Sequence, residues 1–88
     1  TALPDSVGEL ASLTVLDLRN NRLAAVPESL GNLRGLVEID LRNNRFTSLP
    51  DAIAHLPHLE KLDLRWNKRL VLPAWLNTLE QRGCVVYR

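Results

Sequence analysis

A 23-residue periodicity runs through almost the whole chain and constrains its fold more than any other feature. Apolar residues, one asparagine and one proline recur in the same order in the stretches 13–35, 36–58 and 59–81. In the middle stretch these positions are Leu36, Ile39, Leu41, Asn44, Phe46, Leu49, Pro50, Ile53 and Leu56. A fixed period in this range is typical of stacked repeats, because one unit alone cannot bury its own apolar side chains. The sequence therefore predicts a solenoid.

Each repeating unit is predicted to contain a short strand, a turn and a return segment. Apolar and polar residues alternate around Leu16, as in a strand with one buried face. The turn contains the repeated asparagine: Asn21, Asn44 and Asn67. We expect these amides to be buried and to bond backbone of their own and the next coil, because an unpaired buried amide is costly. A proline then opens the return segment, which suits the first position of a short helix.

The pattern L-x-x-L-x-L-x-x-N-x-L, followed by the return segment L-P-x-x-[IL]-x-x-L, resembles the leucine-rich repeat family. The 23-residue period is similar to that of the intracellular Ras-group class, which includes small-GTPase pathway scaffolds, plant intracellular repeat proteins and bacterial relatives. The resemblance implies an α/β solenoid with a parallel β-sheet on the concave face and short helices on the convex face. It also implies a protein-binding, non-enzymatic module without a cofactor.

We expect a single domain over residues 1–88. Its predicted parts are a partial repeat at 1–12, full repeats at 13–35, 36–58 and 59–81, and a C-terminal closing strand at 82–88. In the third repeat, Arg69 stands where the earlier repeats have an apolar residue, so we expect a one-residue readjustment that lets Leu70 fill the site. Trp75 is expected to cover the end of the core.

The register of the closing strand follows from counting three periods from the first repeat. This count places Val85 and Tyr87 inward, and it places Cys84, Val86 and Arg88 outward. Cys84 is therefore predicted to be an exposed thiol on an edge strand.

Outward strand positions define two charged columns on the predicted concave face, one of aspartates and one of arginines. The candidate partner-binding residues are Asp17, Arg19, Asp40, Arg42, Asp63, Arg65, Trp66 and Arg88. Arginines can grip carboxylates of a partner with paired hydrogen bonds, and arginine beside tryptophan is a frequent composition of interface hot spots. The alternative is a solvated face in which the two columns form weak ion pairs, each worth about 0–1 kcal/mol.

Composition argues against several other functions. The formal net charge of +1 is too small for a nucleic-acid or anionic-membrane footprint. One cysteine permits no internal disulfide, and this favours a reducing, cytoplasmic location. His55 and His58 lie three residues apart, but no third ligand has the right spacing, so no metal site is predicted.

Three functions remain open from the sequence, and an interaction module that binds another protein is the first. The second is a targeting or regulatory segment of a larger signalling enzyme or scaffold, such as a kinase, a GTPase-pathway protein or a ubiquitin ligase. The third is self-association. A monomer is expected, with a dimer through the open edge of the last strand as the alternative.

Overall fold

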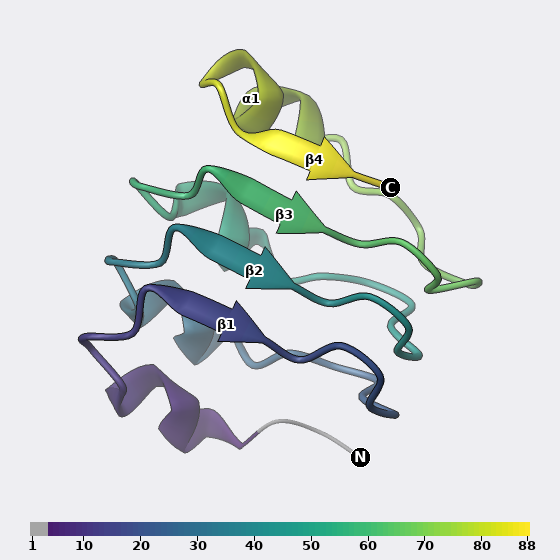
Figure 1. Ribbon diagram of the computed structural model, residues 1–88, viewed down its shortest axis with the longest axis horizontal. Helices are drawn as coiled ribbons and strands as arrows, with labels where there is room; N and C mark the ends of the chain where they lie inside the picture. The colour runs from purple at the N-terminus through teal and green to yellow at the C-terminus, as the bar shows by residue number, and fades with distance from the viewer. Residues whose placement is uncertain (1–3) are drawn as a thin grey trace.

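The computed structural model describes residues 4–88, which wind into stacked coils with one strand in each (Figure 1). The first three residues of the predicted partial repeat lie outside the described residues. In chain order the elements are η1 (Asp5–Glu9), β1 (Val15–Asp17), η2 (Glu28–Asn32), β2 (Glu38–Asp40), η3 (Asp51–His55), β3 (Lys61–Asp63), α1 (Leu76–Gln81) and β4 (Val85–Tyr87). The η elements are 3₁₀ helices.

The four strands form one parallel sheet in the order β1-β2-β3-β4, and the helical segments lie behind it (Figure 1). Leu16 pairs with Ile39 and Ile39 pairs with Leu62, so equivalent residues of successive coils are neighbours. Since side chains alternate across a strand, these three residues point together toward the helices. The sheet thus has an apolar face toward the core and a polar face toward solvent.

The core lies between the sheet and the helical segments and is mostly aliphatic. Fully buried side chains come from every part of the central coils: Leu30, Leu33, Leu36, Ile39, Leu41, Phe46, Ile53, Leu56, Leu62, Leu76 and Leu79. Burying each one contributes about 1.5–3 kcal/mol relative to exposure. Because these side chains contact neighbouring coils, the stabilisation depends on stacking.

The repeated asparagine connects each coil to the one before it. Asn44 is only 7% exposed, and its Nδ2 donates to the carbonyl oxygens of Leu18 at 2.8 Å and Leu41 at 3.1 Å. Its Oδ1 accepts a hydrogen bond from the backbone N–H of Leu23 at 3.1 Å. Asn67 makes equivalent bonds to the preceding coil. The contacts therefore run to the preceding coil, whereas the sequence analysis expected the next one.

Asn21 is exposed, unlike its counterparts Asn44 and Asn67. The prediction that all three asparagines are buried is therefore wrong for Asn21. Its Nδ2 bonds only the carbonyl oxygens of Leu18 and Arg19 in its own coil, and the residue is exposed. Within the described residues no strand precedes β1, so no earlier coil covers this amide.

The return segments are 3₁₀ turns of five residues in the first three coils. Each turn has a proline at its N-cap position: Pro4, Pro27 and Pro50. The sequence suggested that proline would be the first residue of the helix, so the helix begins one residue later than predicted. The carbonyl oxygen of each proline accepts the first helical hydrogen bond. Successive turns approach closely: a Cβ on Gly8 would lie 2.7 Å from the carbonyl oxygen of Ser29. Glycine at this position therefore permits η1 to stack on η2.

The last coil has one additional residue, which corrects the predicted register of the closing strand. Lys61 follows Pro50 by 11 residues, whereas its partner Val85 follows Pro73 by 12. The α-helical turn α1 replaces a 3₁₀ turn here, and Gly83 leaves it with a φ of +92°. A shift of one residue reverses every side chain of a strand.

The consequences of this shift are visible in β4. Val85 and Tyr87 are exposed rather than inward, and Val86 packs against the core. Cys84 is 4% exposed, and burial raises the pKa of its thiol. The prediction of an exposed thiol is wrong.

A further expectation for the third repeat concerns Leu70. Leu70 packs against the core while Arg69 is exposed, so the predicted readjustment is confirmed. Leu72 stands at the position of Val26 and Leu49, which are buried, but it is 48% exposed. Within the described residues no later return segment covers it.

We expect Asn44→Ala to lower the free energy of unfolding by about 3 kcal/mol or more, because it leaves several buried backbone groups of two coils without partners. Urea denaturation at neutral pH measures this. Asn21→Ala is the matched control and should cost less than about 1 kcal/mol, because its amide bonds exposed groups of one coil. Equal losses in the two variants would contradict the role given to coil-to-coil bonding.

Candidate functional site

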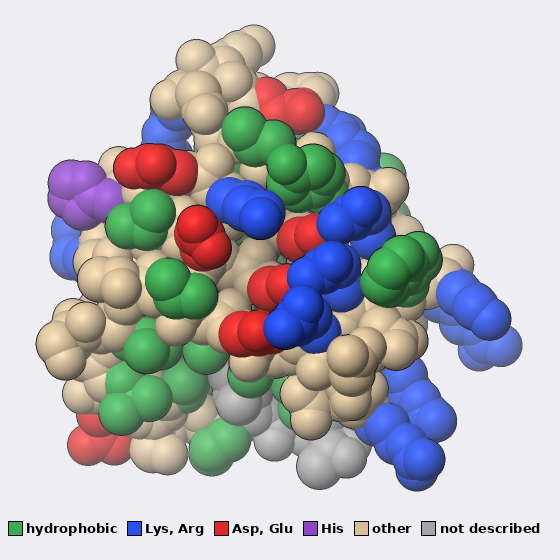
Figure 2. Space-filling view, in the orientation of Figure 1, with side chains coloured by type: hydrophobic (Ala, Val, Ile, Leu, Met, Phe, Trp, Pro, Cys, Tyr) green, Lys and Arg blue, Asp and Glu red, His purple; other side chains and the backbone are tan. Residues whose placement is uncertain are grey.

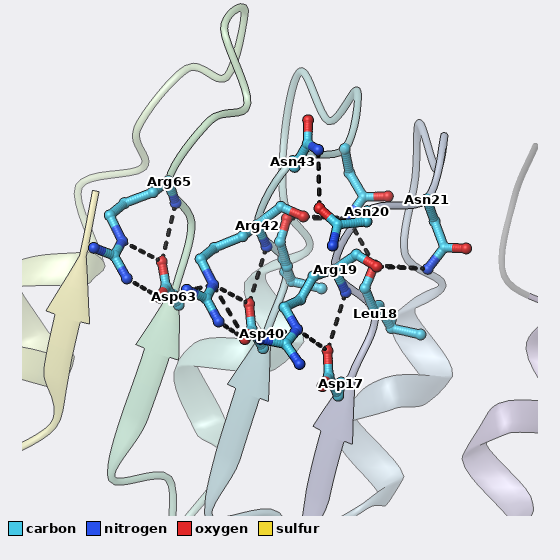
Figure 3. Close-up of polar contacts among 12 residues, drawn as sticks. Asp17, Leu18, Arg19, Asn20, Asn21, Asp40, Arg42, Asn43, Asp63 and Arg65 are labelled. Carbon is cyan, nitrogen blue, oxygen red and sulfur yellow. Dashed lines mark hydrogen bonds and ion pairs between the residues drawn. The ribbon is translucent and has the colours of Figure 1, made fainter.

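The solvent-facing side of the sheet carries an aspartate on each of β1, β2 and β3 and an arginine two residues after each. Asp17, Asp40 and Asp63 are aligned by the strand register. Arg19, Arg42 and Arg65 follow in the loops, and their side chains fold back over the strands (Figure 3). We call these six residues the Asp–Arg ladder.

Each arginine of the ladder is held by the aspartate of its own coil. Nε of Arg42 lies 3.0 Å from Oδ1 of Asp40, and Nη2 lies 2.7 Å from Oδ2. Arg65 contacts Asp63 in the same way, at 3.0 and 2.8 Å. Paired geometry of this kind fixes the plane of the guanidinium.

The ladder also connects neighbouring coils. Nε of Arg42 lies 3.3 Å from Oδ2 of Asp63, and Nε of Arg19 lies 3.9 Å from Oδ2 of Asp40. The arginines therefore separate the aspartates of successive strands and offset the repulsion that three aligned carboxylates would have. Ion pairs between the two columns, which the sequence offered as an alternative, are thus present.

Charge pairing stabilises the ionised forms of Asp40, Arg42 and Arg65, and it outweighs burial, which opposes them. The Asp63 side chain is only 2% exposed and lies between two arginines. The hydrogen bond from Arg42 lowers the pKa of Asp40, while the same bond raises the pKa of Arg42. The bond to Asp63 likewise raises the pKa of Arg65. Most of the ladder's charge is thus satisfied internally, and Figure 2 shows its red and blue side chains interleaved at the centre of this face.

An aromatic and cationic cluster lies at the β3–β4 end of the same face. The Arg65 guanidinium carbon is 4.9 Å from the centre of the Tyr87 ring and 5.7 Å from the centre of the Trp66 ring. Lys61 also lies near the Tyr87 ring, with its Nζ 5.6 Å from the ring centre. Trp66 is 64% exposed and Tyr87 is 39% exposed. We call Lys61, Arg65, Trp66 and Tyr87 the aromatic–cationic cluster.

The backbone at Trp66 adopts an uncommon conformation. Its φ is +67°, and the equivalent residues of the two earlier coils, Asn20 and Asn43, have φ values of +61° and +54°. Asparagine tolerates this left-handed region, whereas a bulky residue there is strained. The two asparagines also bond each other, with Nδ2 of Asn43 donating to Oδ1 of Asn20 at 2.9 Å (Figure 3).

The structure brings together seven of the eight residues that the sequence analysis singled out. Arg88 is the exception, because the additional residue in the last coil moves it out of the arginine column. It pairs with Glu80 near the end of α1. Tyr87 takes the outward place beside Asp63 instead. Sequence reasoning missed Tyr87 because only the length of the last return segment determines which way it points.

Trp75 lies on the opposite side of the sheet, immediately before α1. It packs partly against the core, and its Nε1 donates to Oδ1 of Asp51 at 3.0 Å. This contact joins the last two return segments, as expected for a residue that covers the end of the core.

Other candidate chemistry is weak in the described part of the chain. His55 and His58 are exposed, and residues 4–88 contain no group of three or more His, Cys, Asp or Glu side chains placed to hold a metal ion. None of the helices in this range has the length and apolar character needed to span a bilayer.

Comparison with known proteins identifies the family. The sequence model of the family described as leucine rich repeat matches residues 4–68, and a second model of the same description matches residues 58–79. The chain belongs to the leucine-rich repeat family. No curated protein sequence matches it.

A solved leucine-rich repeat protein of Leptospira interrogans has a similar structure, with a TM-score of 0.86 and 32% sequence identity. The match covers 100% of this chain and 22% of that one, so this chain spans less than a quarter of its neighbour's length. The stacked coils described above are therefore a leucine-rich repeat solenoid. Leucine-rich repeats are generally protein–protein interaction modules.

We expect Trp66→Asn to raise the free energy of unfolding by roughly 0.5–1 kcal/mol. The substitution relieves the left-handed strain, worth about 1–2 kcal/mol, and loses an exposed cation–π contact of about 0.5–1 kcal/mol. Urea denaturation measures the change. Trp66→Phe keeps a bulky ring in the same conformation and should leave stability near that of the native chain. A lower free energy of unfolding for Trp66→Asn than for Trp66→Phe would contradict the backbone strain assigned to Trp66.

Proposed function

We propose that this chain is a non-enzymatic protein-interaction module whose concave face binds a partner protein. The observation that carries the proposal is the aromatic–cationic cluster. Arg65 is held by Asp63 and lies beside two exposed aromatic rings, at 4.9 and 5.7 Å. Exposed Trp, Tyr and Arg side chains are the types enriched in interface hot spots, and the orientation of Arg65, which Asp63 fixes, lowers the entropic cost of binding.

The Asp–Arg ladder has a supporting role in this proposal. Asp17, Arg19, Asp40 and Arg42 form a charged but internally paired platform beside the cluster. Such a platform contributes specificity, since a partner must match its alternating charge to avoid leaving an ion unpaired. The apolar rings of Trp66 and Tyr87 then supply most of the contact area.

The class of leucine-rich repeat to which the chain belongs is part of the same proposal. The 23-residue spacing of β1, β2 and β3 and the Leu-Pro return segments support the intracellular Ras-group-like class. We propose the repeat boundaries 13–35, 36–58 and 59–81 on that spacing. A monomeric, cytoplasmic protein is part of the proposal, and the single cysteine, which permits no internal disulfide, supports the cytoplasmic location.

A second candidate is a targeting or regulatory segment of a larger signalling enzyme or scaffold. The observation that favours it is the length of the Leptospira neighbour, of which this chain covers only 22%. In that case the concave face described here is one part of a longer binding surface.

Affinity capture from a lysate of the source organism tests the main proposal. The baits are the native chain and a double variant, Trp66→Asn with Tyr87→Ser, in which two exposed rings are removed without emptying the core. A protein retained by the native chain should be lost, or its affinity reduced by about tenfold or more, since removing a hot-spot residue costs 2 kcal/mol or more.

His58→Asn is the matched control bait for this experiment. His58 is exposed and lies outside the cluster, in the turn that precedes β3. It should retain the partner as the native chain does. Circular dichroism confirms that each bait is folded. Full retention by the double variant would refute the proposed site.

A further inference from the structure

The loops that follow the strands carry a second set of basic residues outside the Asp–Arg ladder. Each loop has the same order: an arginine, a residue with positive φ, the structural asparagine and then a basic residue. The final positions are Arg22, Arg45 and Lys68, one on each of three successive coils, and Arg69 follows the last of them. We call these four residues the loop-edge basic column.

The charge of this column is not neutralised by the protein. All four residues are exposed, and none has an ion-pair partner among the side chains that the structure describes. In Figure 2, basic side chains project on the right, where the strands end, and no acidic side chain lies beside them. The ladder's arginines are all paired, whereas the charges at the loop edge are available to a ligand.

The column borders a cleft with further binding groups. The cleft has a volume of about 730 Å³, and its lining includes Arg22, Arg45 and Lys68 together with Asn20, Asn43 and Trp66. The bond from Nδ2 of Asn43 to Oδ1 of Asn20 leaves Nδ2 of Asn20 and Oδ1 of Asn43 available. These are one donor and one acceptor, the complement of a peptide group.

We propose that this cleft binds an extended, carboxylate-rich peptide segment of a partner protein. The carboxylates would pair with the basic column, and the asparagines would bond the peptide backbone. Neighbouring coils lie about 4.8 Å apart, so three coils span about 10 Å, which is the reach of about three extended residues. A short acidic segment is therefore long enough to contact all three loops.

A peptide fits this surface better than a nucleic acid does. Single-stranded nucleic acids bind across several stacked aromatic side chains, and Trp66 is the one aromatic residue that lines the cleft. The cleft is separate from the proposed concave-face contact except at Trp66, which belongs to both.

Fluorescence anisotropy with a labelled six-residue glutamate peptide tests the proposal, and a six-residue oligothymidylate serves as the second probe. The native chain should bind the glutamate peptide, and more weakly as salt is added. Arg45→Glu should weaken binding by about tenfold or more, because it replaces a charge-assisted contact by repulsion.

Arg34→Glu is the matched control, since it makes the same change of charge at an exposed residue between η2 and β2, away from the cleft. It should change affinity by less than about twofold because exposed charges beyond about 10 Å are largely screened. Tyr87→Ser should have no effect, because Tyr87 does not line the cleft; this variant separates a failure here from a failure of the concave-face proposal.

Three results would each overturn the inference: no binding of the glutamate peptide, equal weakening by Arg34→Glu and Arg45→Glu, or tighter binding of the oligothymidylate.

Discussion

The contact of each coil with the coil before it is the interaction on which the rest of this structure depends. A single coil has one short strand and one turn of helix, and it cannot remove its own leucines from water. Asn44 and Asn67 complete the contact by bonding carbonyl oxygens of two coils at once, which leaves no described buried side-chain polar atom without a partner. The contact between successive coils therefore both stabilises the fold and aligns the residues of the concave face.

The alignment of coils also determines the chemistry of the concave face. Because equivalent residues are neighbours, three carboxylates line up on adjacent strands, and this arrangement is tolerable only with cations between them. Arg42 meets that need by contacting Asp40 and Asp63 together. The cost is that these arginines are engaged within the protein. We therefore propose that recognition rests on groups that the ladder does not use, which are the rings of Trp66 and Tyr87 and the basic residues at the loop edge.

Much of this could be predicted from the sequence, because a repeated pattern specifies repeated structure. The strand positions, the buried leucines and the two charged columns all follow from the period. The prediction failed for the last coil, where Cys84, Tyr87 and Arg88 each face differently from the expected direction. The return segment there is an α-helical turn that packs against β4, and period counting cannot detect its one added residue. The loop-edge basic column repeats with the same period, but its residues lie in loops, whose orientation the alternation of strand residues does not specify.

The most direct test of the concave-face assignment is a hydrogen–deuterium exchange footprint of the chain with its captured partner. Binding at the aromatic–cationic cluster predicts added protection in β3, in β4 and in the loop that contains Trp66. It also predicts unchanged exchange in η2 and η3 behind the sheet. Protection confined to η2 and η3, with none in β3 or β4, would show that the partner binds the convex side and would contradict the proposed function.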